Sequence, residues 1–131
     1  MIYIDTSALL KLVKTDEAEG PALRAYLQGT AEPRLASSAL LAIEARRGML
    51  RGRPDGLPKV DLLLAEVTRI DISDAVIERA SRLPDPLLRS LDSIHLATAL
   101  LVREELDVLL SYDDRLLAAA KDHGIPTASP T

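Results

Sequence analysis

Four acidic residues that lie far apart in the sequence could together hold a metal ion. Asp5 follows a short apolar stretch at the start of the chain, and Asp113 follows another near its end. Glu44 and Asp92 each interrupt a segment rich in leucine and alanine. An unpaired carboxylate is costly to bury, so acids placed among residues typical of a core need a partner or a function. Their spacing excludes a single run of surface charge.

Glu44 provides the sharpest indication of a site. At 100° per residue it shares one side of a helix with Leu40 and Leu41. The alternative is a structural pair with Arg47, which is worth only about 0.2–0.5 kcal/mol on a helix surface. We favour a role in a site.

The other three acids also have structural alternatives. Asp92 falls in the first turn of an expected helix with Ser90 as its N-cap, where the helix dipole favours negative charge. Asp92 nevertheless faces the apolar side, together with Leu96. Asp5 and Asp113 each come where an N-cap is expected, but both also follow strands, whose carboxyl ends gather ligands in a parallel sheet. Because Asp5 and Asp113 would lie at the same edge of the sheet, we favour a common site over two separate N-caps.

Several carboxylates without Cys or His point to a particular class of ion. Mg²⁺ and Mn²⁺ prefer oxygen ligands, whereas zinc prefers nitrogen and sulfur. One or two such ions can activate a water, neutralise a phosphate and stabilise the leaving oxygen. The chemistry expected of these acids is phosphodiester hydrolysis.

Alternating strand-like and helical patterns must position these acids. We expect strands at residues 1–5, 34–37, 67–72, 108–112 and 125–128, and helices at 6–14, 16–28, 38–50, 74–83, 90–105 and 114–123, with a shorter helical piece from residue 59. Ser37 or Ser38 is the expected N-cap of the third helix, and Gly52 and residues 54–58 are expected to break the chain. This order predicts an α/β fold with a central parallel sheet of four to five short strands flanked by helices.

Composition and length set the broader limits. The 131 residues predict a single domain spanning 1–131, and 47% hydrophobic residues support a core. With no cysteine, disulfides and thiol metal sites are excluded. Asp5 and Lys11 interrupt the first apolar stretch, so we expect no signal peptide or membrane span, and a cytoplasmic protein. The net charge of −4 argues against a protein that coats nucleic acid, but not against an enzyme.

Four segments in order resemble the blocks of a PIN domain. They are IYIDTSALL, SSALLAIEARR, LDSIHLATAL and LLSYDDRLLAAA, and they span nearly the whole chain. Within that family the chain is most similar to VapC-type toxins of toxin–antitoxin pairs. The resemblance implies a PIN-like three-layer fold and an endoribonuclease that uses Mg²⁺ or Mn²⁺ and leaves 5′-phosphate and 3′-hydroxyl ends. It also implies a homodimer inhibited by a VapB-like antitoxin.

The resemblance also indicates which residues of this chain form the site. It implies that the acidic site consists of Asp5, Glu44, Asp92 and Asp113. For the fourth acid the directly following Asp114 is an alternative, and we prefer Asp113 because it is nearer the strand end.

Two hydroxyl residues and one histidine lie beside these acids in the sequence. Thr6 and Ser7 match the hydroxyl positions after the first acid and are expected to orient it or a bound water. His95 is expected to be a packed or polar neighbour of the site rather than a general base, because no nucleophile motif surrounds it.

The sequence contains two candidate binding surfaces. A basic cluster, with Arg46 and Arg47 at its centre and Arg51 and Arg53 beyond, would bind RNA phosphates, form a solvated face or contact the antitoxin. The strip of Leu9, Leu10 and Val13 is a candidate antitoxin contact or part of the core.

Two other functions remain alternatives. A phosphoacceptor signalling domain should carry an acidic pair after its first strand, but Asp5 is followed by Thr6 and Ser7. It should also carry a lysine at the end of a strand, whereas Lys121 falls within an expected helix. A catalytically idle PIN-like interaction module is the second alternative. Site substitutions would leave the biological effect of such a module unchanged.

Overall fold

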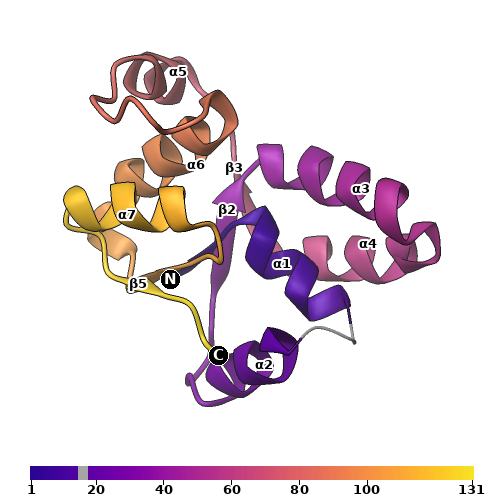
Figure 1. Ribbon diagram of the computed structural model, residues 1–131. Helices are drawn as coiled ribbons and strands as arrows, with labels where there is room; N and C mark the ends of the chain where they lie inside the picture. Colours follow the sequence, from indigo (N-terminus) through magenta and orange to yellow (C-terminus); the bar gives the residue numbers. More distant parts are fainter. Residues whose placement is uncertain (15–17) are drawn as a thin grey trace.

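The chain forms a five-stranded parallel sheet with helices on both faces (Figure 1). The computed structural model describes residues 1–14 and 18–131. In sheet order β3-β2-β1-β4-β5, the strands are β3 (Val67–Ile70), β2 (Leu35–Ser38), β1 (Ile2–Ile4), β4 (Val108–Leu110) and β5 (Thr127–Ala128). The expected α/β fold with a parallel sheet is confirmed.

Seven α-helices and two short 3₁₀ helices occur in the described residues. They are α1 (Thr6–Val13), α2 (Glu19–Gln28), α3 (Leu40–Gly52), η1 (Pro54–Gly56), α4 (Leu57–Ala65), α5 (Asp74–Ser81), α6 (Ser90–Leu101), η2 (Arg103–Glu105) and α7 (Asp114–Asp122). In Figure 1, α1, α3 and α4 lie to one side of the sheet and α6 and α7 to the other, with α5 against α6.

Alternation along the central strand builds a separate core on each face of the sheet. Ile2 and Ile4 pack with residues of α1, α3 and α4, whereas Tyr3 points to the opposite face, against α6 and α7. In β4, Leu110 joins the first core and Leu109 the second. The period of two in side-chain direction therefore places one polar group, the Tyr3 hydroxyl, inside an apolar layer.

The predicted break after α3 is wrong in its position. Gly52 is the last residue of α3, and residues 54–58 form η1 and the start of α4. Pro54 begins the 3₁₀ helix, and Pro58 lies in the first turn of α4. Proline is tolerated there because the first N–H groups of a helix have no intrahelical acceptor.

The start of α3 and the N-cap of α6 differ from the prediction. Helix α3 begins at Leu40 because Ser38 ends β2, and the Ser38 hydroxyl accepts a hydrogen bond from the Leu40 N–H group at 3.1 Å. The residue before α6 is Arg89, so Ser90 is not its N-cap. The predicted start of the second helix at Asp16 lies outside the described residues, and α2 is seen from Glu19.

Helix α6 ends at Leu101, earlier than the predicted 105, and η2 continues the chain. Among the described residues, no helix combines the length and the apolar character that crossing a bilayer requires.

Candidate active site

Two of the acids meet at the carboxyl edge of the neighbouring strands β1 and β4. Asp5 follows β1 and Asp113 follows β4 with two residues between. The hydroxyl of Ser111 links them: it donates to Asp5 Oδ2 at 2.6 Å and accepts from the Asp113 N–H group at 3.0 Å. The parallel pairing of β1 and β4 thus joins residues that are over a hundred positions apart.

Asp5 is held in one orientation by three donors. Its Oδ1 accepts from the Ser7 hydroxyl at 2.7 Å and from the Ala8 N–H group at 3.0 Å, which also makes Asp5 the N-cap of α1. Ser111 binds the other oxygen. The side chain is buried, and burial raises the pKa of Asp5 although these hydrogen bonds oppose the rise. A cation bound nearby would lower the pKa again by favouring the ionised carboxylate.

Asp92 and Asp113 face each other across a guanidinium group. Nε of Arg89 lies 3.3 Å from Asp92 Oδ2, and Nη2 of Arg89 lies 3.3 Å from Asp113 Oδ2. Burial, followed by the charge of Asp113, raises the pKa of Asp92, with Arg89 opposing. Asp113 Oδ1 accepts from the N–H groups of Arg115 and Leu116, so Asp113 is the N-cap of α7.

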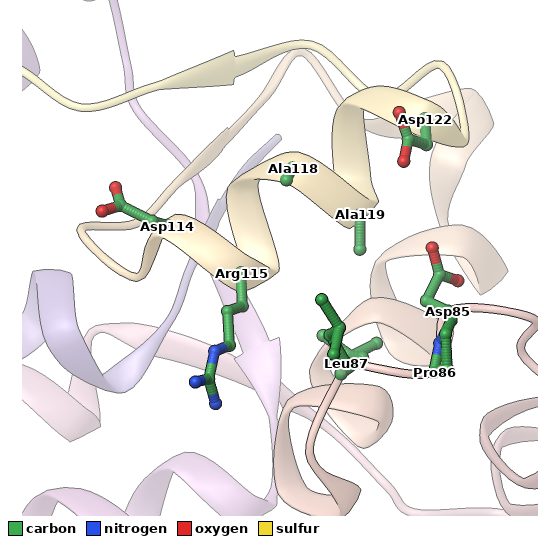
Figure 2. A pocket seen from close by; sticks show the side chains of 9 residues that line it. Asp85, Pro86, Leu87, Asp114, Arg115, Ala118, Ala119 and Asp122 are labelled. Atoms are coloured by element: carbon green, nitrogen blue, oxygen red, sulfur yellow. The ribbon is translucent and has the colours of Figure 1, made fainter.

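Asp114 has different surroundings from Asp113. It is exposed, and Figure 2 shows its carboxylate at the start of α7 directed away from Arg115 and Leu87. The hollow in that view, about 340 Å³, lies between α7 and residues 85–88, and neither Asp5, Glu44, Asp92 nor Asp113 lines it. Of the two adjacent acids, only Asp113 faces Asp92.

Glu44 reaches the same region from α3. Its Oε1 accepts from the Thr6 hydroxyl at 2.8 Å and lies 2.7 Å from His95 Nε2. Burial acts to raise the pKa of Glu44, but the hydrogen bond from His95, the charge that His95 carries when it is protonated and the hydrogen bond from Thr6 outweigh it, so the pKa is lowered. Thr6 thus orients Glu44 rather than Asp5, whereas Ser7 orients Asp5.

His95 continues inward to the buried tyrosine of β1. The Tyr3 hydroxyl lies 2.7 Å from His95 Nδ1 and accepts from the Ser38 N–H group at 3.1 Å. Both rings are buried and pack edge to face. Burial raises the pKa of Tyr3 well above its ordinary value, so its hydroxyl keeps its proton.

The donor set fits a hard divalent cation. Asp5, Asp92, Glu44 and Asp113 offer only oxygen, which Mg²⁺ and Mn²⁺ prefer. Arg89 already places a positive charge between two of them. Within residues 1–14 and 18–131, no three acidic or histidine side chains are close enough to enclose an ion by themselves. A bound ion would therefore retain waters, as Mg²⁺ usually does.

A groove of about 430 Å³ opens beside Glu44 and Thr6. Arg47 and Arg51 line it, together with apolar side chains from α1, α3 and α6: Leu10, Leu40, Ile43 and Leu91. Arg46 is directed elsewhere, since its Nε pairs with Asp61 at 3.0 Å. The basic cluster is therefore divided, and Arg47 and Arg51 are its members nearest the acids.

The predicted docking strip on α1 is mostly core. Leu9 is fully buried and Val13 nearly so, because both pack into the first core. Leu10 alone of the three reaches the groove beside Glu44.

Three residues of the site were not singled out from the sequence. Ser111 could have been noticed because it lies two positions before Asp113, near the end of β4. The alternation of β1 places Tyr3 opposite Ile2 and Ile4, but nothing local connects it to a histidine 92 positions away. The i,i+3 spacing of Arg89 and Asp92 could have indicated one of its two pairs, but the pair with Asp113 depends on how α6 and α7 meet.

Comparisons with known proteins identify the family of this chain. The family model described as "PIN domain" matches residues 2–122. "Ribonuclease VapC35" of Mycobacterium tuberculosis is 40% identical over 99% of this chain and 97% of its own.

Solved structures share the fold. A chain of a toxin–antitoxin complex from Klebsiella pneumoniae aligns with a TM-score of 0.70 and 25% identity, covering 100% of this chain and 98% of its own. Mycobacterium tuberculosis VapC20, described as a sarcin-ricin loop cleaving toxin, aligns with a TM-score of 0.78 and 16% identity over 99% and 100% of the two chains. The chain belongs to the PIN-domain family, and within it to the VapC proteins.

Proposed function

We propose that this chain is an endoribonuclease that hydrolyses RNA with the help of Mg²⁺ or Mn²⁺ and acts as the toxin of a VapBC-type pair. The observation that carries the proposal is a line of contacts among three acids: Ser111 bridges Asp5 and Asp113, and Arg89 lies between Asp113 and Asp92. The full-length similarity to a protein named as a ribonuclease supports RNA as the substrate class.

Asp5, Asp92 and Asp113 are the residues that would hold the ion, with Glu44 beside them. The ion would supply positive charge for the phosphate and a water of lowered pKa. Ser7, Ser111 and the start of α1 keep Asp5 in place.

Glu44 has the properties of a proton acceptor at this edge. Its lowered pKa keeps it ionised, and one of its oxygens remains available beyond the contacts with Thr6 and His95. In the reaction, a water oxygen bonds to phosphorus, the bond from phosphorus to the 3′ oxygen breaks, and that oxygen takes a proton. The products are a 5′-phosphate and a 3′-hydroxyl.

Substrate binding is assigned to the groove beside Glu44. Arg47 and Arg51 lie where phosphates of an RNA strand could pair with them. Arg46, which was a candidate for the same role, pairs with Asp61 on α4 and is expected to contribute less. The chain has only three aromatic residues, so base stacking is not its expected mode of recognition.

The expected partners are a VapB-like antitoxin and a second copy of the chain. The structural likeness to a component of a toxin–antitoxin complex supports the first. The apolar residues of the groove, Leu10, Leu40, Ile43 and Leu91, offer a surface for an antitoxin helix beside the acids. The cytoplasm, where both RNA and an antitoxin would be met, is the proposed location.

A cleavage assay tests the proposal. The purified protein is incubated with total cellular RNA in chelator, in Mg²⁺ and in Mn²⁺, and the product ends are mapped. We expect cleavage only with metal, leaving 5′-phosphate ends, and none with a folded Asp92→Asn variant. Equal cleavage in excess chelator, or by that variant, would contradict it.

A further inference from the structure

The second core contains two hydrogen-bonded polar side chains, Tyr3 and His95, that have no role in the proposed reaction. His95 and Tyr3 are 2% and 0% exposed, and both lie among apolar residues of α6, α7 and β4. Burying a hydroxyl and an imidazole in such a layer is costly unless both are hydrogen-bonded. Each of them is bonded, and the chain of hydrogen bonds ends on Glu44.

The direction of these hydrogen bonds follows from the groups at the two ends. The Ser38 N–H group can only donate, so the Tyr3 oxygen accepts from it. At the other end, the ionised carboxylate of Glu44 can only accept, so Nε2 of His95 donates to it, and Nδ1 of a neutral ring then accepts the phenol proton of Tyr3. A neutral imidazole with an accepting Nδ1 carries its proton on Nε2, and Nε2 faces the carboxylate of Glu44.

Both donors to Glu44 bind the same oxygen. The Thr6 hydroxyl and His95 Nε2 contact Oε1, and no hydrogen bond to Oε2 occurs among the described residues. One oxygen is therefore fixed by the protein, while the other remains available to a ligand. Partners of this kind orient a site carboxylate or imidazole in metal sites generally.

We propose that Tyr3 and His95 are positioning residues: Tyr3 fixes His95 in the tautomer with its proton on Nε2, and His95 with Thr6 aims the free oxygen of Glu44 at the metal or the attacking water. The tautomer is a property of the fold itself, whereas the effect on activity rests on the proposed function.

The tautomer can be measured in the metal-free wild-type protein. A long-range ¹H–¹⁵N NMR spectrum at neutral pH resolves the ring nitrogens of the only two histidines, and His123→Asn assigns them. We expect a protonated Nε2 and an unprotonated Nδ1 for His95, and loss of this single tautomer in Tyr3→Phe. A proton on Nδ1 of the wild type, or an unchanged tautomer in Tyr3→Phe, would overturn the inference.

The effect on Glu44 is tested with two amide substitutions of similar size. The amide nitrogen of His95→Gln can take the place of Nε2, whereas that of His95→Asn is too short to reach Glu44. In folded protein we expect His95→Asn to lose about 10- to 100-fold in Mn²⁺ affinity, measured by electron paramagnetic resonance, or in kcat, with KM for RNA little changed. His95→Gln should recover most of that loss.

One variant serves as a control, and different results would contradict the positioning role and the proposed function. His123→Asn should match the wild type, because His123 pairs with Asp85 away from the acids. Wild-type binding and turnover in His95→Asn, or an equal loss in His95→Gln, would overturn the positioning role. A wild-type protein that neither binds Mn²⁺ nor cleaves RNA would instead refute the proposed function, and the tautomer measurement would still decide how His95 is held.

Discussion

Asp113 and Asp114 are neighbours in sequence but not in environment. Asp113 faces Arg89 and Asp92, whereas Asp114 is exposed. We predict that Asp113→Asn lowers kcat by about 100-fold or more, the scale expected when a group that stabilises charge in the reaction is lost. Asp114→Asn should change it by only about twofold. Side-by-side kinetics that show the larger loss for Asp114→Asn would reverse the assignment.

The raised pKa of Asp92 predicts how stability depends on pH. Its folded pKa lies above the unfolded value because burial and the charge of Asp113 disfavour ionisation. Such a group stabilises the fold at low pH and loses that contribution as pH rises through the folded pKa. Without metal, wild-type stability should therefore fall from about pH 4 upward, relative to Asp92→Asn.

At neutral pH we expect metal-free Asp92→Asn to be more stable than the wild type by less than about 1 kcal/mol, because loss of the Arg89 pair and of the helix-dipole interaction opposes the gain. Urea unfolding of both proteins in chelator between pH 4 and pH 7.5 measures the difference. If the difference in unfolding free energy between the two proteins does not grow with pH, the pKa of Asp92 is not raised in the metal-free protein.

At the scale of elements, Asp113 has a structural role besides the chemical role that we propose for it. Asp113 accepts from the N–H groups of Arg115 and Leu116 and so caps α7. Removing such a cap with alanine costs about 1 kcal/mol, whereas asparagine caps as well as aspartate. We predict that Asp113→Ala lowers the free energy of unfolding by about that amount, while Asp113→Asn leaves it nearly unchanged, with both inactive. Equal stability of the two variants would exclude the cap as a source of stability.

Sequence patterns predicted the elements better than their junctions. The strands and helices were found because apolar period and turn residues are local properties of the chain. The segment 54–58 was misjudged because proline breaks a helix interior but is accommodated in a first turn, and only the structure shows which applies. Ser38 was placed in a helix because its capping chemistry is equally compatible with the end of a strand.

The acids of the candidate site and the hydroxyls of Thr6 and Ser7 beside them could be predicted, but the more distant groups that orient the acids could not. Asp5 and Asp113 were recognisable because strand ends share an edge in a parallel sheet. The contact of Tyr3 with His95 depends on how α6 packs on the sheet, and the contact of Arg89 with Asp113 depends on how α6 meets α7. Such long-range side-chain contacts have no periodic signature.

For the whole molecule, the acidic edge and the groove beside it define how an antitoxin should inhibit. Arg89 shows that a guanidinium fits between Asp92 and Asp113. We predict that a VapB-like antitoxin places a basic side chain at this edge and an apolar helix face in the groove of Leu10 and Ile43.

Hydrogen exchange of the complex and replacement of basic residues in the antitoxin test this prediction. Protection should appear at the starts of α1, α6 and α7, and inhibition should weaken when the inserted residue is removed. If antitoxin binding protects none of these segments, and inhibition survives removal of its basic residues, insertion at the acidic edge is excluded.

The central claim is that the acidic edge binds the divalent cation on which RNA hydrolysis depends. Crystals of the active protein soaked in Mn²⁺ test it most directly, through the anomalous signal of the ion. We expect a peak roughly 2 Å from carboxylate oxygens of Asp92 and of Asp5 or Asp113, with Arg89 displaced from between them. Active protein whose ordered Mn²⁺ lies elsewhere, with Arg89 still paired to both acids, would contradict the account.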